Sequence, residues 1–390
     1  MTTIKLVSGS RLGAQFPYTI ERIFSSQGNM SHVCLASVAA EPGADLSMVV
    51  LKVARSGDQY SSFYEETLNN EVERLRRLKH PGVVRLFPIQ RQGIPNLPYI
   101  AQATSLPGTP WFSVMEYLAG GSLMDLIEQG PMEIGMALEI TRSVAGTLDY
   151  LHSRRQVHLD LKPDNLLFRT IPIPGEMMEP VLIDFGIARN VGQRGLEART
   201  LQYAPPERVQ EDHQDPNAAS PHPAMDVYSL GVVLYEMLTG QLPFRGRSKK
   251  RMAAAILQGR LRPPSAQRSE IRPELDAIIL KMMARNPDDR PTAEESAILL
   301  EEIAIKGGYL PRYPSRRSDG EKPVVHPAPR RSRSAWRLLF RLLLVLLVAA
   351  QLIFILGTHR YWGTVIDLSN DSLQTLVANI QQLYGELGSR

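Results

Sequence analysis

Cysteine is almost absent from this chain of 390 residues, in which Cys34 is the only one. A single cysteine excludes an intrachain disulfide framework and a cysteine-based zinc cluster, and it fits a reducing compartment. Residues 1–18 lack the basic start and apolar core of a signal peptide. No repeat occurs at the periods of solenoids or propellers. The composition, 43% apolar and 22% charged, is that of an ordinary globular chain.

A basic excess is missing from most of the chain, although the net charge of the whole is +4. Residues 312–390 carry 11 of the 44 Lys and Arg and 5 of the 40 Asp and Glu, which leaves residues 1–311 with a net charge of −2. A nucleic-acid-binding domain places its basic excess on the domain itself. We therefore expect no nucleic acid among the partners. None of the eight histidines is assigned to a metal.

The spacing of apolar residues predicts two different parts before the C-terminal tail. The first part alternates strand-like runs with one charged helix at residues 63–79, whose apolar residues recur at helical spacing. His80-Pro81-Gly82 is predicted to end that helix. Residues 122–310 are predicted to be mostly helical. The strands are expected at residues 33–39, 48–53 and 83–87.

One long apolar run occurs near the end of the sequence. From Leu338 to Gly357 only Arg341 and Gln351 are polar. At 1.5 Å rise per residue such a run spans roughly 30 Å, the thickness of a bilayer core, and it predicts a transmembrane helix at residues 336–357. A buried core helix is the alternative, and the length of the run argues against it.

Arginines set the expected orientation of this helix. Five lie just before it or in its first turns and only Arg360 follows it closely, so the positive-inside rule predicts a single-pass cell-membrane protein with residues 1–335 in the cytoplasm and the C-terminus outside. Residues 311–335 have the Pro-rich composition of a linker, and its basic cluster is suited to anionic lipid. The five are Arg330, Arg331, Arg333, Arg337 and Arg341.

Acidic residues and an amide stand in an informative order in the second half of the chain. The stretch His158-Leu159-Asp160-Leu161-Lys162-Pro163-Asp164-Asn165 is followed, 19 residues after Asn165, by Asp184-Phe185-Gly186. Phosphoryl transfer needs charge neutralisation on the phosphates, usually by Mg²⁺, and a carboxylate that orients the attacking hydroxyl. Neither motif is specific alone, but the two in this order indicate phosphoryl transfer.

This set of motifs resembles the eukaryotic-like Ser/Thr protein kinases of bacteria over about residues 18–305. The resemblance implies an α+β fold of two lobes, a small β-rich N-lobe and a larger α-helical C-lobe, to which the transmembrane helix is added. It implies ATP as cosubstrate and Asp160 and Lys162 as the catalytic residues. Asn165 and Asp184 would hold Mg²⁺, with Mn²⁺ as an alternative.

The same resemblance assigns the ATP-binding residues. Val50-Leu51-Lys52 matches the strand whose lysine holds the α- and β-phosphates, and Glu71 stands where the helix partner of that lysine is expected. Met115 matches the gatekeeper residue before the hinge. The competing Glu73 lies about 200° around the helix from Glu71. Further implied contacts to ATP are the hinge backbones of Glu116 and Leu118 and the glycine-rich-loop positions Ser26, Gly28, Ser31 and Val33.

Other matching positions hold the family's fold together. Glu207, at the end of Tyr203-Ala204-Pro205-Pro206-Glu207, is expected to pair with Arg290, and Asp226 is expected to tie down the catalytic loop. Mutation of such residues should harm folding first and turnover second. The implied structural set is His158, Gly186, Thr200, Glu207, Asp226 and Arg290.

Two departures from the family pattern bear on function. Only Gly28 remains of three loop glycines, because Ser26 and Ser31 stand at the other two positions, which puts ATP affinity in question. Leu159 replaces the arginine that normally contacts a phosphorylated activation-loop residue, and residues 187–199 contain no Ser, Thr or Tyr. We therefore expect a kinase that needs no activation-loop phosphorylation.

The sequence as a whole predicts a membrane-anchored signalling kinase that transfers the ATP γ-phosphate to Ser or Thr hydroxyls of proteins. Lys162, two residues after Asp160, favours Ser/Thr over Tyr. The alternative is a pseudokinase, a membrane-tethered binding protein, which the degraded glycine loop and Leu159 favour and the retained catalytic set opposes. A homodimer stays open. The expected segments are an N-terminal extension (1–17), N-lobe and hinge (18–118), C-lobe (119–310), linker (311–335), transmembrane helix (336–357) and extracytoplasmic tail (358–390).

Overall fold

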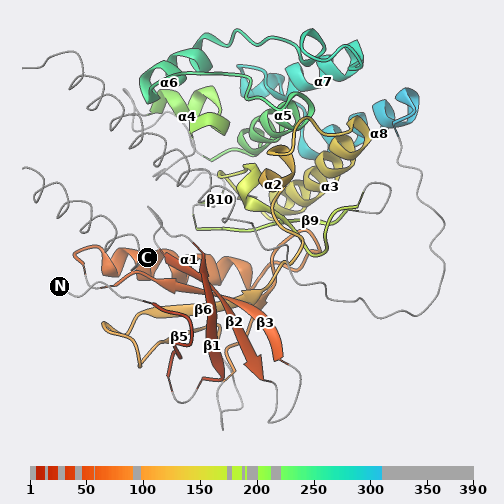
Figure 1. Ribbon diagram of the computed structural model, residues 1–390. Coiled ribbons are helices and arrows are strands. Elements are labelled where there is room, and N and C mark those ends of the chain that lie inside the picture. The colour runs from red at the N-terminus through yellow and green to blue at the C-terminus, as the bar shows by residue number, and fades with distance from the viewer. Residues whose placement is uncertain are drawn as a thin grey trace, which may run out of the picture. The chain divides into compact units, whose positions relative to one another are not determined.

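The chain divides into two units, Met1–Asp319 and Gly320–Arg390. The computed structural model describes residues of the first unit only, and Figure 1 shows their arrangement. The predicted transmembrane helix and tail therefore lie outside the described residues. Within the described ranges, no helix combines the length and the apolarity needed to cross a bilayer. These ranges are 6–13, 16–24, 31–39, 46–56, 58–90, 98–173, 178–186, 189–190, 201–211 and 221–309.

An antiparallel six-stranded sheet and one long helix, α1 (Ser61–Leu75), form the N-lobe (Figure 1). The strands run in the order β1-β2-β3-β6-β4, and β5 also pairs with β6. Alternate residues of β3 are buried in the sheet core, so Lys52, between buried Leu51 and Val53, points to the opposite face. The strands are β1 Tyr18–Phe24, β2 Ser31–Ala39, β3 Leu46–Ala54, β4 Leu86–Phe87, β5 Ile100–Gln102 and β6 Trp111–Glu116.

Two predicted boundaries near His80 are wrong. The helix ends at Leu75 instead of Lys79, because the next residues form a tighter turn in which Leu78 N–H bonds the carbonyl of Leu75 at 3.0 Å. The strand predicted at residues 83–87 is reduced to Leu86–Phe87. Val84 N–H instead donates to the carbonyl of Leu182 in the C-lobe at 3.0 Å, so this segment fastens one lobe to the other.

The C-lobe is mostly helical, and α5 is its central helix, because every residue from Ala224 to Thr239 is buried. Gly240, at φ 68°, ends α5 in the left-handed conformation that favours glycine. Two small two-stranded sheets, one of β7 and β10 and one of β8 and β9, lie between the helices in the sequence. The helices are α2 Leu123–Ile127, α3 Ile134–Ser153, α4 Pro206–Glu211, α5 Pro223–Thr239, α6 Lys249–Gln258, α7 Pro273–Met282 and α8 Ala293–Gly307. The shorter elements are β7 Gln156–Val157, η1 Pro163–Asn165, β8 Leu166–Phe168, β9 Pro180–Leu182, β10 Arg189–Asn190, η2 Leu201–Tyr203, η3 Pro264–Ala266 and η4 Pro287–Asp289.

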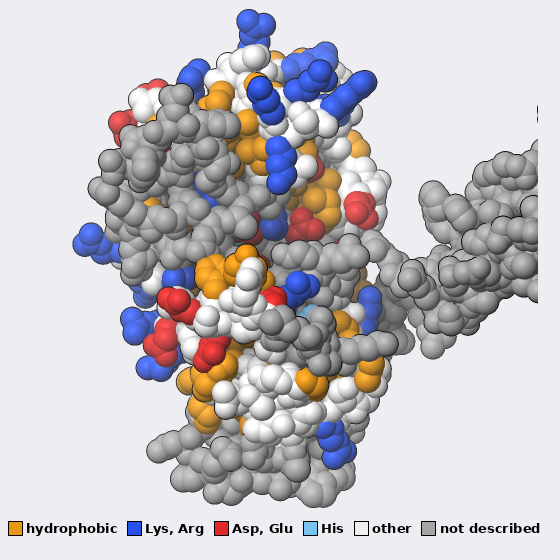
Figure 2. Space-filling model, turned by 90° about the vertical axis from the view of Figure 1, so that its left-hand side faces the viewer, with side chains coloured by type: hydrophobic (Ala, Val, Ile, Leu, Met, Phe, Trp, Pro, Cys, Tyr) orange, Lys and Arg blue, Asp and Glu red, His pale blue; other side chains and the backbone are white. Residues whose placement is uncertain are grey.

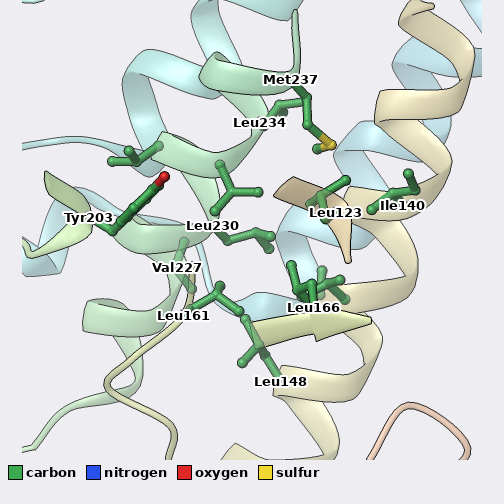
Figure 3. Packing of buried hydrophobic residues seen from close by; sticks show 14 of the residues in the cluster. Leu123, Ile140, Leu148, Leu161, Leu166, Tyr203, Val227, Leu230, Leu234 and Met237 are labelled. Carbon is green, nitrogen blue, oxygen red and sulfur yellow. The ribbon is translucent and has the colours of Figure 1, made fainter. Parts of the chain in front are cut away.

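The core of the C-lobe reaches into the loop that carries the predicted catalytic residues. Figure 3 shows Leu161 and Leu166 among side chains of α3 and α5, such as Leu148 and Leu230. Leu161 and Leu166 are at most 1% exposed. Burial of a leucine stabilises by about 1.5–3 kcal/mol, so these two side chains fix the polar residues between them.

Candidate active site

A closed group of three charges joins β3, α1 and the turn after β9. Lys52 Nζ lies 2.8 Å from Glu71 Oε1, 2.6 Å from Glu71 Oε2 and 3.0 Å from Asp184 Oδ1. Burial alone would lower the pKa of Lys52, but the carboxylates of Asp184 and Glu71 outweigh it and raise that pKa above its usual range. The Lys52 ammonium in turn lowers the pKa of Asp184 to about 2. The predicted pairing of Lys52 with Glu71 is present, whereas Glu73 is exposed and pairs with two arginines just after the end of α1.

Helix α1 holds both backbone groups of Phe185. Glu71 Oε1 accepts the Phe185 N–H at 3.2 Å, and Arg74 Nη1 donates to the Phe185 carbonyl at 2.9 Å. The Phe185 ring is buried edge-on against the His158 ring, with centroids 5.0 Å apart. The position of α1 is therefore coupled to the Asp184-Phe185-Gly186 turn. Arg74 was not singled out from the sequence.

The catalytic loop brings three predicted residues to one point. Asp160 Oδ2 accepts hydrogen bonds from Lys162 Nζ at 2.8 Å and from Asn165 Nδ2 at 2.9 Å. Asn165 Nδ2 also donates to the Asp160 carbonyl at 2.8 Å. The side chains of Asp160 and Lys162 remain partly exposed. A hydroxyl group can thus reach a carboxylate that is held in place beside a cation.

Asp226, at the start of α5, ties this loop down as expected. Its buried carboxylate accepts the N–H groups of His158 and Leu159, each at 2.8 Å, and lies 2.9 Å from His152 Nε2. Burial by itself would raise the pKa of Asp226, but the hydrogen bond and charge of His152, with the backbone donors, bring it below its usual range. Leu159 has φ 68°, a left-handed conformation that a leucine rarely adopts. The two hydrogen bonds to Asp226 maintain that turn.

The side chain of Leu159 has apolar surroundings. Leu159 is 4% exposed and forms a small buried cluster with Val157 and Met225. Its carbonyl accepts a hydrogen bond from Nη1 of the buried Arg208 on α4. The side chain at this position is therefore buried among hydrocarbon groups.

The hinge is fixed by a side chain from the C-lobe. Arg169 binds Glu116 through two hydrogen bonds, Nε to Oε2 at 3.2 Å and Nη2 to Oε1 at 2.9 Å. Arg169 Nη1 also donates to the carbonyl of Pro81 at 2.6 Å. The predicted gatekeeper Met115 and the hinge residue Leu118 are buried. The side chain of Glu116 thus holds the hinge, and adenine recognition by its backbone stays a prediction.

The two predicted metal ligands fit a hard cation. Asp184 Oδ1 accepts from Lys52 and from the Gly186 N–H, while the side chain as a whole is 46% exposed, so its second oxygen is accessible. The amide nitrogen of Asn165 is engaged with Asp160, which leaves its oxygen for a cation. No cluster of three or more His, Cys, Asp or Glu that could hold a metal occurs among the residues the structure describes. One or two protein oxygens plus substrate phosphates are what Mg²⁺ commonly uses.

Not every predicted site residue can be placed. Ser26, Gly28 and Thr200 lie outside the described residues. Ser31 begins β2 and is buried, and Val33 stands opposite Lys52 in the sheet. The contact of this loop with phosphates stays a prediction.

The remaining structural pair is present. Arg290 Nη1 and Nη2 lie 2.7 Å and 2.8 Å from the two carboxylate oxygens of Glu207. Nearby, Ser229 Oγ donates to the Tyr203 carbonyl at 2.9 Å, and Tyr203 OH donates to Glu236 Oε2 at 2.8 Å. These contacts fix η2 against α5 and join α4 to Arg290, which follows η4.

This fold and this group of residues are those of a protein kinase domain. The family model of the protein kinase domain matches residues 27–298, and the chain belongs to that family. It is 32% identical over 318 residues to the serine/threonine-protein kinase PknB of Mycolicibacterium smegmatis, covering 79% of this chain and 46% of that protein. It is 30% identical over 264 residues to a probable serine/threonine-protein kinase, SCO3848, of Streptomyces coelicolor, covering 65% and 35%. It is 33% identical over 249 residues to the serine/threonine-protein kinase PknL of Mycobacterium tuberculosis, covering 57% and 59%. The chain spans about half the length of the curated relatives it matches.

Proposed function

We propose that this chain transfers the γ-phosphate of ATP to Ser or Thr hydroxyls of protein substrates. The observation that carries the proposal is the joint placement of the two polar groups. Lys52 and Glu71 of the N-lobe are paired with each other, and Lys52 also pairs with Asp184. Asp160 is held by Lys162 and Asn165 in the C-lobe half. A pseudokinase would not require both groups to be intact.

In this proposal each residue has a task. Lys52, positioned by Glu71, binds phosphate oxygens of ATP. Asp160 accepts the proton of the substrate hydroxyl as its oxygen bonds to the γ-phosphorus, and the bond from that phosphorus to the β-phosphate oxygen breaks to leave ADP. Lys162 donates hydrogen bonds to the transferred phosphoryl group. Mg²⁺ bound by Asn165 and Asp184 would supply charge neutralisation on the phosphates.

The test is transfer of ³²P from [γ-³²P]ATP to a generic basic protein by the full-length chain, with Mg²⁺ and with a chelator. Label that depends on Mg²⁺, is lost in Asp160→Asn and appears on Ser or Thr in phosphoamino-acid analysis supports the proposal. A correctly folded chain that binds ATP without transferring label would instead establish the pseudokinase.

We further propose that activity does not depend on activation-loop phosphorylation. The support is the apolar cluster around Leu159 and the hydrogen bond of Arg74 to Phe185, which ties α1 to the metal-binding turn without a phosphate. Phosphatase treatment is expected to leave kcat within about twofold, whereas Arg74→Met lowers kcat about tenfold, the value of one hydrogen bond from a charged group.

The matched control for Arg74→Met is Arg77→Met, an arginine of the same segment whose side chain is 73% exposed. Its kcat should equal that of the wild type. A large loss of activity after phosphatase treatment, or equal losses in the two variants, would contradict the proposal.

Membrane anchoring through residues 336–357 is also proposed, on the support of the apolar run and its flanking arginines. The full-length chain is expected to sediment with membranes and to be released by non-ionic detergent but not by high salt or alkaline carbonate. Deletion of residues 336–357 should move it to the supernatant. Release by salt alone would show that the arginines bind the surface and that no helix spans the bilayer.

A further inference from the structure

Seven exposed cationic side chains gather around α6, and we call them the α6 basic surface. No acidic residue occurs between Met237 and Ser269 in the sequence. Within the described part of the chain, none of the seven takes part in an ion pair. Figure 2 shows Lys and Arg side chains gathered at the top of the face that α6 occupies in Figure 1. The seven are Arg245, Arg247, Lys249, Lys250, Arg251, Arg260 and Arg262.

The charges of this surface are not needed to form α6. The helix is held to the core by buried Met252, Ala253 and Ile256 and begins at Ser248, whose Oγ accepts the Arg251 N–H at 3.3 Å. Its first turn carries three cations and no acidic residue. Cations at this end oppose the helix dipole, and they also repel one another. Residues that break a local stability rule in this way commonly serve function.

The α6 basic surface lies close to the catalytic loop. Helix α6 packs against α4 and η2. Arg208 of α4 donates to the carbonyl of Leu159, the residue before Asp160. Tyr203 of η2 is fixed by Ser229 and Glu236. One short helix therefore separates the cations from the loop that receives the substrate hydroxyl.

We propose that the α6 basic surface docks an acidic segment of the protein substrate while the acceptor Ser or Thr lies at Asp160. The inference rests on the proposed kinase function. Single exposed ion pairs contribute little, but several like charges together steer and hold an oppositely charged partner. Such docking lowers KM and Kd and leaves kcat unchanged, because it binds ground state and transition state equally. A bilayer seated on the same surface would compete with the protein substrate, since the catalytic loop is one helix away.

The test compares two synthetic peptides with the same Ser-containing core, one extended by six glutamates through a Gly-Ser spacer. The full-length chain is used in non-ionic detergent. The α6 variant combines Lys249→Gln, Lys250→Gln and Arg251→Gln. The control set combines Arg142→Gln, Lys281→Gln and Arg285→Gln, three exposed cations elsewhere on the C-lobe. Fluorescence anisotropy gives Kd without any need for catalysis, and ³²P transfer gives kcat and KM.

In the α6 variant, Kd and KM for the extended peptide are expected to rise about tenfold, as three lost exposed ion pairs would give. The kcat, and both constants for the short peptide, should stay at wild-type values, as should every constant in the control set. Equal losses in both sets, or no change, would overturn the proposal. So would an unchanged peptide Kd with lost binding to phosphatidylserine vesicles, which would assign the surface to lipid. A tenfold loss in Kd without any ³²P transfer would support docking and refute the kinase function.

Discussion

Replacing Asp160 by asparagine is expected to lower the rate of phosphoryl transfer by about 10²–10⁴-fold, the usual contribution of a positioned general base. Asparagine keeps the size of the side chain and one oxygen that can accept from Lys162 and Asn165. It cannot take up the proton of the substrate hydroxyl. The measurement is kcat for ³²P transfer at saturating ATP, with KM for ATP expected to change little because Lys52 and Glu71 are untouched.

The matched control is Asp149→Asn on α3, the same chemical change outside the site, which should leave kcat unaltered. The melting temperature of Asp160→Asn should lie within about 2 °C of the wild type, since the ion pair lost with Lys162 is partly exposed and the asparagine oxygen can still accept from that lysine. A variant that folds normally and keeps more than a tenth of the wild-type kcat would remove Asp160 from the assigned task.

The site residues that could be predicted are those whose motifs fix chemistry and spacing together. Lys52 lies on a strand and Glu71 on a helix, and the structure pairs them. The sequence before His80-Pro81 offered only one other candidate for the helix partner of the lysine, Glu73. The resemblance assigned Glu71 as the partner, and the structure buries it in α1 together with Leu68 and Val72. Helix geometry separated Glu71 from Glu73, because it decides which side chain faces inward.

Three arginines of the site could not be predicted. Arg74, Arg169 and Arg208 each donate to a backbone carbonyl, those of Phe185, Pro81 and Leu159. Every residue offers a carbonyl, so no motif on the accepting side marks such a contact. The partners are separated by 111, 88 and 49 positions along the chain, and only the tertiary fold brings them together.

The wrong strand boundary near His80 has the same origin. Residues 83–87 have the β-branched composition of a strand, but Val84 pairs with Leu182 of the C-lobe. Strand propensity reflects how well a residue fits a half-buried pleated surface. It does not predict which segment of the chain will pair with that residue.

Replacing Arg290 by methionine is expected to lower the free energy of unfolding by about 3–5 kcal/mol, the cost of removing one partner of a buried ion pair. The Arg290 side chain is fully buried, and beyond Glu207 it donates to the carbonyls of Ala284 at 2.8 Å and Ala224 at 3.0 Å. Its guanidinium also lies over the ring of Tyr228, 5.0 Å from the centroid. Methionine would leave the Glu207 carboxylate and the two carbonyls without this donor.

At about 2 °C per kcal/mol for a domain of this size, the melting temperature of Arg290→Met should fall by roughly 6–10 °C in calorimetry. The melting temperature of Arg290→Lys should lie between those of the wild type and Arg290→Met, because lysine keeps the charge and loses the bidentate geometry. The control is Arg285→Met, an exposed arginine five residues earlier, which should melt as the wild type does. Because Arg290 contacts none of the reacting groups, Arg290→Met should keep its kcat when it is assayed well below the melting temperature. Asp160→Asn should behave in the opposite way, with a lower kcat and an unchanged melting temperature. If Arg290→Met and Arg285→Met have the same melting temperature, the ion pair of Arg290 with Glu207 does not stabilise the C-lobe.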